Sequence, residues 1–175
     1  MLIQLNELFT RDGKEKNCTC EIEMECFRTR RSSFDIIRKE PVHLQIRNLG
    51  GRKLLLEGQA NLHLSMPCDR CLKPVDVPFD LEWSEELDLS RSGEERAADL
   101  DEQPYVSGFN LDVDRLLSNE LLLNLPAKIL CREDCKGICN RCGANLNDTS
   151  CTCDQTSPDP RMSVIQDIFQ KYKEV

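Results

Sequence analysis

Hydrophobic and polar residues alternate along two long stretches in the first half of the chain. Residues 53–66 place apolar or small side chains at every even position, and residues 74–84 do so at every odd position. A period of two is typical of a β-strand with one buried face. Because only the short segment Cys68–Lys73 separates them, the two stretches predict an antiparallel hairpin with cysteines at its turn.

Two earlier stretches follow the same pattern. Residues 42–46 predict a strand before the Gly50-Gly51 turn, and residues 18–26 alternate glutamates with Cys18, Cys20, Ile22, Met24 and Cys26. Cysteine is often buried and packs as a small hydrophobic residue, so these three cysteines are predicted to lie in the core and not to bind metal. The N-terminal half is therefore predicted to form an antiparallel sheet, either open or curled into a half-barrel.

The second half of the chain changes character. Residues 84–103 are strongly acidic and predict a solvated loop. Residues 111–125 predict a helix that ends before Pro126. Asp159 and Pro160 suit the start of a terminal helix. Its apolar stripe would comprise Met162, Ile165, Ile168, Phe169 and Tyr172.

Composition and charge limit the possible functions. The chain has 175 residues, of which 39% are hydrophobic and 31% charged, as in a globular protein. Its net charge of −8 lacks the broad positive field of an autonomous nucleic-acid binder, and the basic segment 28–39 is interpreted as a solvated face. No targeting segment or membrane-length apolar run is apparent, so we expect a cytoplasmic protein with reduced cysteines.

Six of the eleven cysteines lie between residues 131 and 153. Cys139 and Cys142 are two residues apart and precede Gly143, and Cys151 and Cys153 follow. This spacing suits a tetrahedral site in a short ribbon, for which Zn²⁺ is the preferred ion. Such a site can contribute on the order of 10 kcal/mol to folding a small module.

A second site is predicted from the other paired cysteines, provided that the helix returns the chain to the hairpin turn. Its ligands would be Cys68, Cys71, Cys131 and Cys135. Free or buried thiols, a redox pair and an iron–sulfur cluster remain alternatives. A redox C-x-x-C is favoured at a helix N-terminus, whereas Cys68 and Cys71 lie between predicted strands.

Nothing in the sequence indicates catalysis. His43 and His63 lie in predicted strands without a catalytic motif, and a four-thiolate zinc site has no open position for substrate. The predicted fold class is α+β. It comprises a β-rich domain over residues 1–130 and, over residues 131–175, a cysteine-rich, zinc-ribbon-like module with a terminal helix.

Several motifs together resemble the YceD family, whose members are named for accumulation of large-subunit ribosomal RNA. They are C-D-R-C-L at 68–72, L-N-L-P at 123–126, C-R-E-D-C-K-G-I-C-N-R-C-G-A-N-L-N at 131–147, C-T-C at 151–153 and D-P-R at 159–161. The resemblance implies a non-enzymatic factor in the synthesis, processing or accumulation of large-subunit (23S) ribosomal RNA and in assembly of the large subunit.

The implied partners are a ribosomal RNA precursor or a large-subunit ribosomal protein, with neither a membrane nor a small-molecule substrate. Lys136, Arg141 and Arg161 flank the predicted zinc module and are candidate contacts for phosphate or a partner. The alternative function is a zinc-containing adaptor or a thiol redox sensor unrelated to ribosomes.

Overall fold

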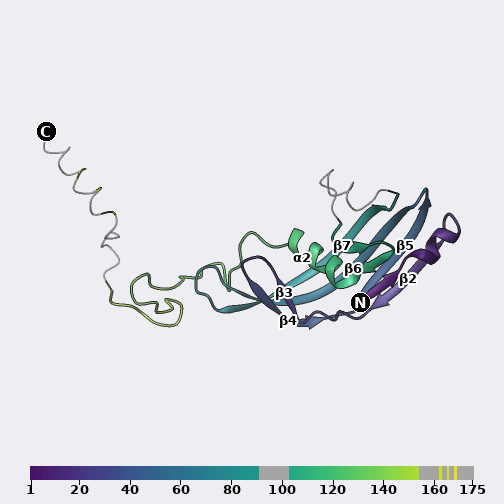
Figure 1. The fold of residues 1–175 in the computed structure, drawn as a ribbon. Helices are drawn as coiled ribbons and strands as arrows, with labels where there is room; N and C mark the ends of the chain where they lie inside the picture. The colour runs from purple at the N-terminus through teal and green to yellow at the C-terminus, as the bar shows by residue number, and fades with distance from the viewer. Residues whose placement is uncertain (91–102, 154–161, 163–164, 166–167, 169–175) are drawn as a thin grey trace. The chain divides into compact units, whose positions relative to one another are not determined.

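The chain divides into two compact units in the computed structural model, which describes residues 1–90 and 103–153 and the single positions 162, 165 and 168. The first unit comprises Met1–Cys68 and Lys73–Ile129. The second comprises Asp69–Leu72 and the chain from Leu130 onward. Figure 1 shows the labelled strands and helix α2, which belong to the first unit.

An open antiparallel sheet forms most of the first unit. Its strands are β2 (Glu15–Cys20), β3 (Cys26–Arg28), β4 (Ser33–Lys39), β5 (Val42–Gly50), β6 (Lys53–Pro67) and β7 (Pro74–Asp88). Strand β6 pairs with β7 along one edge and with β5 and then β4 along the other. Strands β2 and β3 pair with β5 and β4. The sheet is thus a meander of four rows. Strands β2 and β3 form the first row, β4 and β5 the second, β6 the third and β7 the fourth, and each of the first two rows is interrupted between its two strands.

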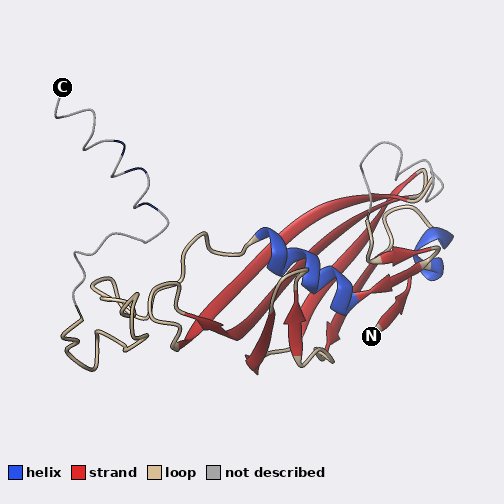
Figure 2. Ribbon diagram, turned by 60° about the vertical axis from the view of Figure 1, so that its left-hand side comes forward, coloured by secondary structure: helices blue, strands red, loops and turns tan. Residues whose placement is uncertain are grey.

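The core lies on one face of this sheet. Figure 2 shows helix α2 (Val113–Leu123) lying across that face. The helix contributes Leu116, Leu117 and Leu121 to the same buried cluster as the even-numbered residues of β6. The cluster also receives residues from the 3₁₀ helix η1 (Asn6–Thr10) and from a small sheet of β1 (Leu2–Gln4), β8 (Val106–Ser107) and β9 (Asn110–Asp112).

The predicted hairpin is confirmed, with pairing from Lys53 opposite Asp88 to Pro67 opposite Pro74. The predicted strand 18–26 is wrong in its middle, because residues 21–25 lie between β2 and β3. There the backbone N–H groups of Glu23 and Met24 donate to Asp114 Oδ1 of α2, at 3.1 and 3.2 Å, in place of a neighbouring strand.

The three cysteines of that stretch differ in burial. Cys20 is 1% exposed and belongs to the core. Cys18 is partly buried and packs against the core cluster, and Cys26 is also partly buried. The core prediction is therefore best met by Cys20.

The predicted acidic loop 84–103 begins too early. Residues 84–88 continue β7, because Leu87 is fully buried opposite Leu54 and extends the alternation. Residues 91–102 lie outside the described part of the chain. Helix α2 is likewise shorter than the predicted 111–125, since Leu111 belongs to β9 and the Asp112 carboxylate accepts from Arg115 N–H at the helix start.

The predicted terminal helix lies outside the described residues, apart from Met162, Ile165 and Ile168, which are exposed. Within the described part of the second unit, backbone pairing consists of one bridge, between Ile138 and Asn145. Among the described residues, no helix is both long and apolar enough to cross a membrane.

Gly58 is required where two strands and an indole ring meet. A Cβ atom at this position would lie 2.3 Å from the Trp83 ring and 2.8 Å from the Leu44 side chain. We expect Gly58→Ala to lower the free energy of unfolding by about 1–3 kcal/mol, the usual cost of overpacking. Urea denaturation measures this loss. The exposed neighbour Gln59 provides a control, because Gln59→Ala should change stability by less than about 0.5 kcal/mol; equal effects would contradict the packing described.

Glu120 is a buried acid on α2, 4% exposed. Burial raises the pKa of its carboxyl group, and nearby Glu85, which accepts a hydrogen bond from the Tyr105 hydroxyl, raises it further. Between the ordinary glutamate pKa and this raised pKa, the Glu120 carboxyl group is protonated in the folded state and ionised in the unfolded state. Over this pH range the free energy of unfolding falls as pH rises, by about 1.4 kcal/mol per pH unit.

We therefore expect Glu120→Gln to raise stability near neutral pH and to flatten its decline between acidic and neutral pH. Thermal unfolding at a series of pH values measures both effects. The exposed Glu82→Gln is the matched control. An unchanged pH profile for Glu120→Gln would show that this carboxyl group has the same pKa in both states.

Candidate metal centres

The structure gathers eight cysteines into two sets of four. Within each set, all sulfur atoms lie within 4.8 Å of one another. The C-terminal cluster consists of Cys139, Cys142, Cys151 and Cys153. The hairpin cluster consists of Cys68, Cys71, Cys131 and Cys135. These are the two sets that the sequence predicts as ligands, and neither contains a cysteine of the 18–26 stretch.

A tight turn shapes the C-terminal cluster. Gly143, with φ +73°, donates its N–H to Cys139 O at 2.9 Å and closes the turn. Arg141 N–H points at Cys139 Sγ, 3.4 Å away. Cys151 Sγ lies 3.4 Å from Cys142 Sγ and 3.5 Å from Cys139 Sγ. The turn therefore places the sulfurs of Cys139 and Cys142 close to that of Cys151, with the Arg141 N–H directed at Cys139 Sγ.

The pKa values in this cluster diverge. The backbone N–H groups of Cys142 and Arg141 lower the pKa of the Cys139 thiol to about 6. For Cys151 the backbone N–H of Cys153 acts in the same direction, but hydrogen bonds with Cys153, Cys139 and Cys142 outweigh it and raise the pKa to about 12. Cys139 thus favours the thiolate form, whereas Cys151 keeps its proton. A divalent cation bound by the cluster would replace the protons that these sulfurs share.

The hairpin cluster begins at the turn between β6 and β7. Cys68 N–H donates to Lys73 O at 2.8 Å, and Leu72 adopts a left-handed conformation with φ +62°. Cys71 Sγ lies 3.6 Å from Cys131 Sγ. Burial raises the pKa of Cys135, but hydrogen bonds from the Asn147 amide and the Gly137 N–H more than offset this and lower it.

Both clusters suit a tetrahedral ion. A zinc ion with Zn–S bonds of about 2.3 Å holds its four sulfurs roughly 3.8 Å apart. Three of the sulfur–sulfur separations are 3.4–3.6 Å, close to this value and much longer than a disulfide of about 2.05 Å, and the other pairs in each cluster lie within 4.8 Å. The donor sets therefore fit zinc, which would bind the four thiolates of each cluster.

Burial in the second unit leads to the same conclusion. Among its described residues, the hydrophobic side chains that are buried are those of Cys71, Cys135 and Cys139. This described part buries thiols in place of larger apolar side chains, so metal coordination would supply it with folding free energy that apolar burial does not.

Two residues that spacing arguments overlooked organise the hairpin cluster. Arg70 Nη1 donates to the carbonyl oxygen of Cys135 at 2.8 Å. Asn147 donates to Cys135 Sγ at 3.3 Å and accepts from Lys136 N–H at 2.8 Å. Both lie inside the cysteine motifs, and their side-chain chemistry was the signal available in the sequence. Such partners orient ligands and tune their basicity.

The structure describes two of the three residues predicted to contact phosphate or a partner. Lys136 and Arg141 are exposed in the second unit, whereas Arg161 lies outside the described residues. The structure therefore brings two of the three predicted cations into the cysteine-rich unit.

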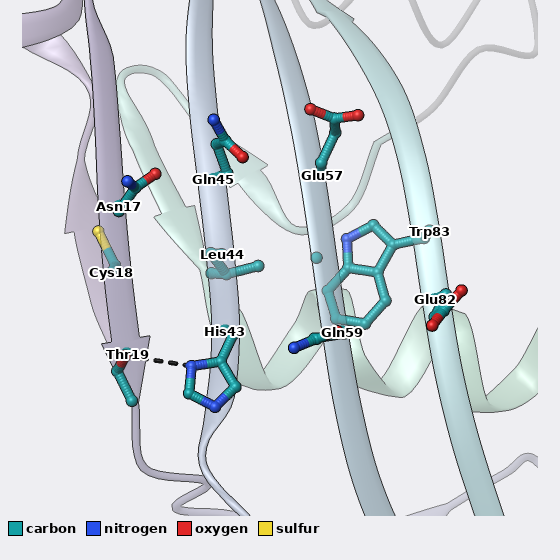
Figure 3. Close-up of a pocket in the computed structure, with 11 residues that line it drawn as sticks. Asn17, Cys18, Thr19, His43, Leu44, Gln45, Glu57, Gln59, Glu82 and Trp83 are labelled. Carbon is teal, nitrogen blue, oxygen red and sulfur yellow. Dashed lines mark hydrogen bonds between the residues drawn. The ribbon is translucent and has the colours of Figure 1, made fainter.

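The histidines are found on the polar face of the sheet. His43 Nδ1 is hydrogen bonded to Thr19 Oγ1 at 3.2 Å, and His63 Nδ1 to Asp76 Oδ1 at 2.5 Å. His43, Glu57 and Glu82 line a shallow groove of about 640 Å³. Figure 3 shows these side chains on three neighbouring strands. The dashed line in Figure 3 marks the hydrogen bond between Thr19 and His43. Each histidine thus has a hydrogen-bond partner on a neighbouring strand.

The structure thus defines a class of protein: an antiparallel sheet accompanied by two four-cysteine clusters that could each hold a metal ion. The chain belongs to the YceD family: the family model described as "Large ribosomal RNA subunit accumulation protein YceD" matches residues 56–169. The match begins within β6 and includes β7, α2 and both clusters. No solved structure matches the chain.

Relatives occur in bacteria and plants. An uncharacterised protein of Mycobacterium tuberculosis is 30% identical over 79 residues, covering 45% of this chain and 38% of its own. A chloroplastic large ribosomal RNA subunit accumulation protein YCED homolog 1 is 29% identical in Zea mays, covering 45% of this chain and 22% of its own. The Arabidopsis thaliana protein of that name is 25% identical, covering 73% and 44%. The chain thus spans less than half the length of these curated relatives.

Metal content tests the two clusters. Protein purified without chelators should contain about two zinc ions per chain by elemental analysis, because each closed set takes one. Cys142→Ser and Cys131→Ser should each lose about one ion, from different clusters. Cys20→Ala, which removes a core thiol, should keep both ions and lose only packing stability. Equal metal loss in all three variants would contradict the assignment, as would metal-free wild-type protein.

Proposed function

We propose that this chain is a non-enzymatic factor that supports the accumulation of large-subunit ribosomal RNA and the assembly of the large subunit. The family match over residues 56–169 carries the proposal, because it covers the hairpin, the helix and both cysteine clusters. Two plant relatives bear the name of this function. The cytoplasm is the compartment in which we expect the chain to act, on a ribosomal RNA precursor or a large-subunit ribosomal protein.

The chemistry of the clusters supports a structural role for their metal. Zinc held by four thiolates is closed to water and substrate, unlike catalytic zinc, which keeps an open position. Cys68, Cys71, Cys135 and Cys139 are buried, whereas Cys131 and Cys142 are exposed. A thiolate that coordinates a metal is less reactive toward an oxidant than a free thiolate, so full coordination favours a scaffold over a redox sensor.

In this proposal the second unit presents cations on a rigid surface. Lys136 N–H is fixed by Asn147, and Arg141 N–H by Cys139 Sγ, while both residues are exposed. Cations held in this way position phosphate groups without reading bases. They would orient the chain on precursor RNA.

Deletion of the gene tests the proposal. We expect mature large-subunit RNA to fall relative to small-subunit RNA, with immature large subunits accumulating on sucrose gradients, because losing an assembly factor lowers the yield of mature particles. Small-subunit RNA from the same cells provides the internal control. An unchanged ratio of the two RNAs would contradict the proposed function.

Complementation separates the parts of the proposal. The wild-type chain should restore the ratio, whereas Lys136→Glu/Arg141→Glu should restore it incompletely while retaining both zinc ions. Full rescue by this variant would exclude the chosen cations only.

A further inference from the structure

An arginine-rimmed groove lies within the first unit, away from both cysteine clusters in the sequence. The turn between β3 and β4 forms one wall and the outer side of α2 forms the other, enclosing about 770 Å³. That volume lies within the range of about 300–1,000 Å³ found for ligand sites. All of its lining residues belong to the first unit.

Four guanidinium groups line this groove. They belong to Arg28, Arg30, Arg31 and Arg115, and among the described residues no acidic side chain lines the groove. In a chain with net charge −8, this concentration of positive charge is local. The sequence alone indicated a solvated face for segment 28–39. It could not show that α2, far away in the sequence, forms a second wall beside this segment.

The arginines differ in how they are held. Arg115 Nη1 donates to Pro104 O at 3.4 Å, and its Nε lies 3.5 Å from Asp112 Oδ2. Arg30 and Arg31 are exposed, and neither forms an ion pair within the described part of the chain. Their guanidinium groups are thus available for an anionic ligand.

The turn that presents Arg30 and Arg31 is fixed by Thr29. Its backbone N–H donates to Ser32 O at 2.8 Å, and its hydroxyl oxygen accepts from the N–H groups of Arg31 and Ser32, at 3.3 and 3.0 Å. A preorganised turn loses less conformational entropy when a ligand binds. These hydrogen bonds therefore hold the turn that carries Arg30 and Arg31 in one conformation before a ligand binds.

Apolar residues make up much of the remaining lining, which is called the floor of the groove. Leu122 is 55% exposed, and Phe27, Pro104 and Leu125 also line the groove, together with the polar residues Thr29, Ser118 and Asn119. A ligand suited to this site must offer negative charge along its length and flat apolar faces between the charges. Unpaired nucleotides have this combination, since their phosphates pair with arginine and their bases cover apolar or guanidinium surfaces.

We propose that this groove binds a single-stranded segment of large-subunit ribosomal RNA. This inference rests on the proposed function and names a contact surface for it. Double-stranded RNA fits less well, because its bases are stacked inside the helix and cannot reach an apolar floor. An acidic peptide would satisfy the arginines but would leave most of that floor uncovered.

Fluorescence anisotropy with the full chain, zinc bound, tests the proposal. The probe is a fluorescein-labelled single-stranded RNA of mixed sequence, about ten nucleotides long, within the usual site sizes of such grooves. Arg30→Glu/Arg31→Glu should weaken binding about tenfold or more. It should also lower the salt dependence of log K by about 0.7 for each phosphate that the variant no longer neutralises.

The matched control is Arg11→Glu/Arg38→Glu, which changes net charge equally. Both of its arginines are exposed in the first unit and lie outside the groove lining. It should alter binding by less than about twofold. A further variant, Leu122→Ser, keeps every charge and should weaken single-strand binding several-fold, because it removes apolar surface on which the bases lie.

Three results would overturn the groove assignment: equal loss of affinity in the two double variants, equal affinity for the duplex of the same sequence, or displacement of the RNA by a polyglutamate peptide at equal concentration. Circular dichroism should show the wild-type fold in each variant. None of these results bears on the deletion phenotype, so a failed groove assignment leaves the proposed function standing, and an unchanged RNA ratio in the deletion strain refutes that function separately.

Discussion

The hairpin of β6 and β7 is the constraint on which the rest of the structure depends. Its fifteen cross-strand pairs run without interruption from Lys53–Asp88 to Pro67–Pro74. A slip of one residue would turn every buried side chain of either strand to the polar face. Gly58 and Trp83 oppose each other in this register, where the indole ring occupies the space that any Cβ would need. The register therefore fixes the core face against which α2 packs.

The same hairpin supplies two cysteines at its turn. Cys68 and Cys71 follow the last pair of β6 and join Cys131 and Cys135 in one compact set of sulfurs. Strand pairing and hydrophobic burial stabilise the first unit, whereas the buried hydrophobic positions described in the second unit are cysteines. The described parts of the two units thus bury different kinds of side chain, and a metal held by these clusters would stabilise the second unit.

The sequence predicts the features that depend on local pattern. Alternation identified β6 and β7, and paired spacing identified both cysteine sets. The break at residues 21–25 could not be predicted in this way, because Asp114, about ninety positions away, takes the backbone donors of Glu23 and Met24. Likewise, residues 84–88 looked like a solvated run until Leu87 was paired with Leu54.

The groove shows the same limit of local reasoning. Arg28, Arg30 and Arg31 are adjacent in sequence and were interpretable only as a charged segment. Their combination with Arg115 and Leu122 depends on how α2 crosses the sheet. Arg70 and Asn147 were similarly hidden, since their importance lies in hydrogen bonds to Cys135. Long-range packing therefore creates the surfaces that local patterns do not reveal.

Two observations support direct contact between the chain and precursor large-subunit RNA: the family match, which points to large-subunit ribosomal RNA, and a locally positive groove with an apolar floor in an acidic chain. Ultraviolet crosslinking in growing cells, followed by sequencing of the attached RNA, tests this contact. We expect crosslinks enriched in unpaired segments of large-subunit precursor over small-subunit RNA. Equal recovery of the two RNAs, or crosslinks no more frequent than those of an unrelated acidic protein, would show that the chain does not contact this RNA directly.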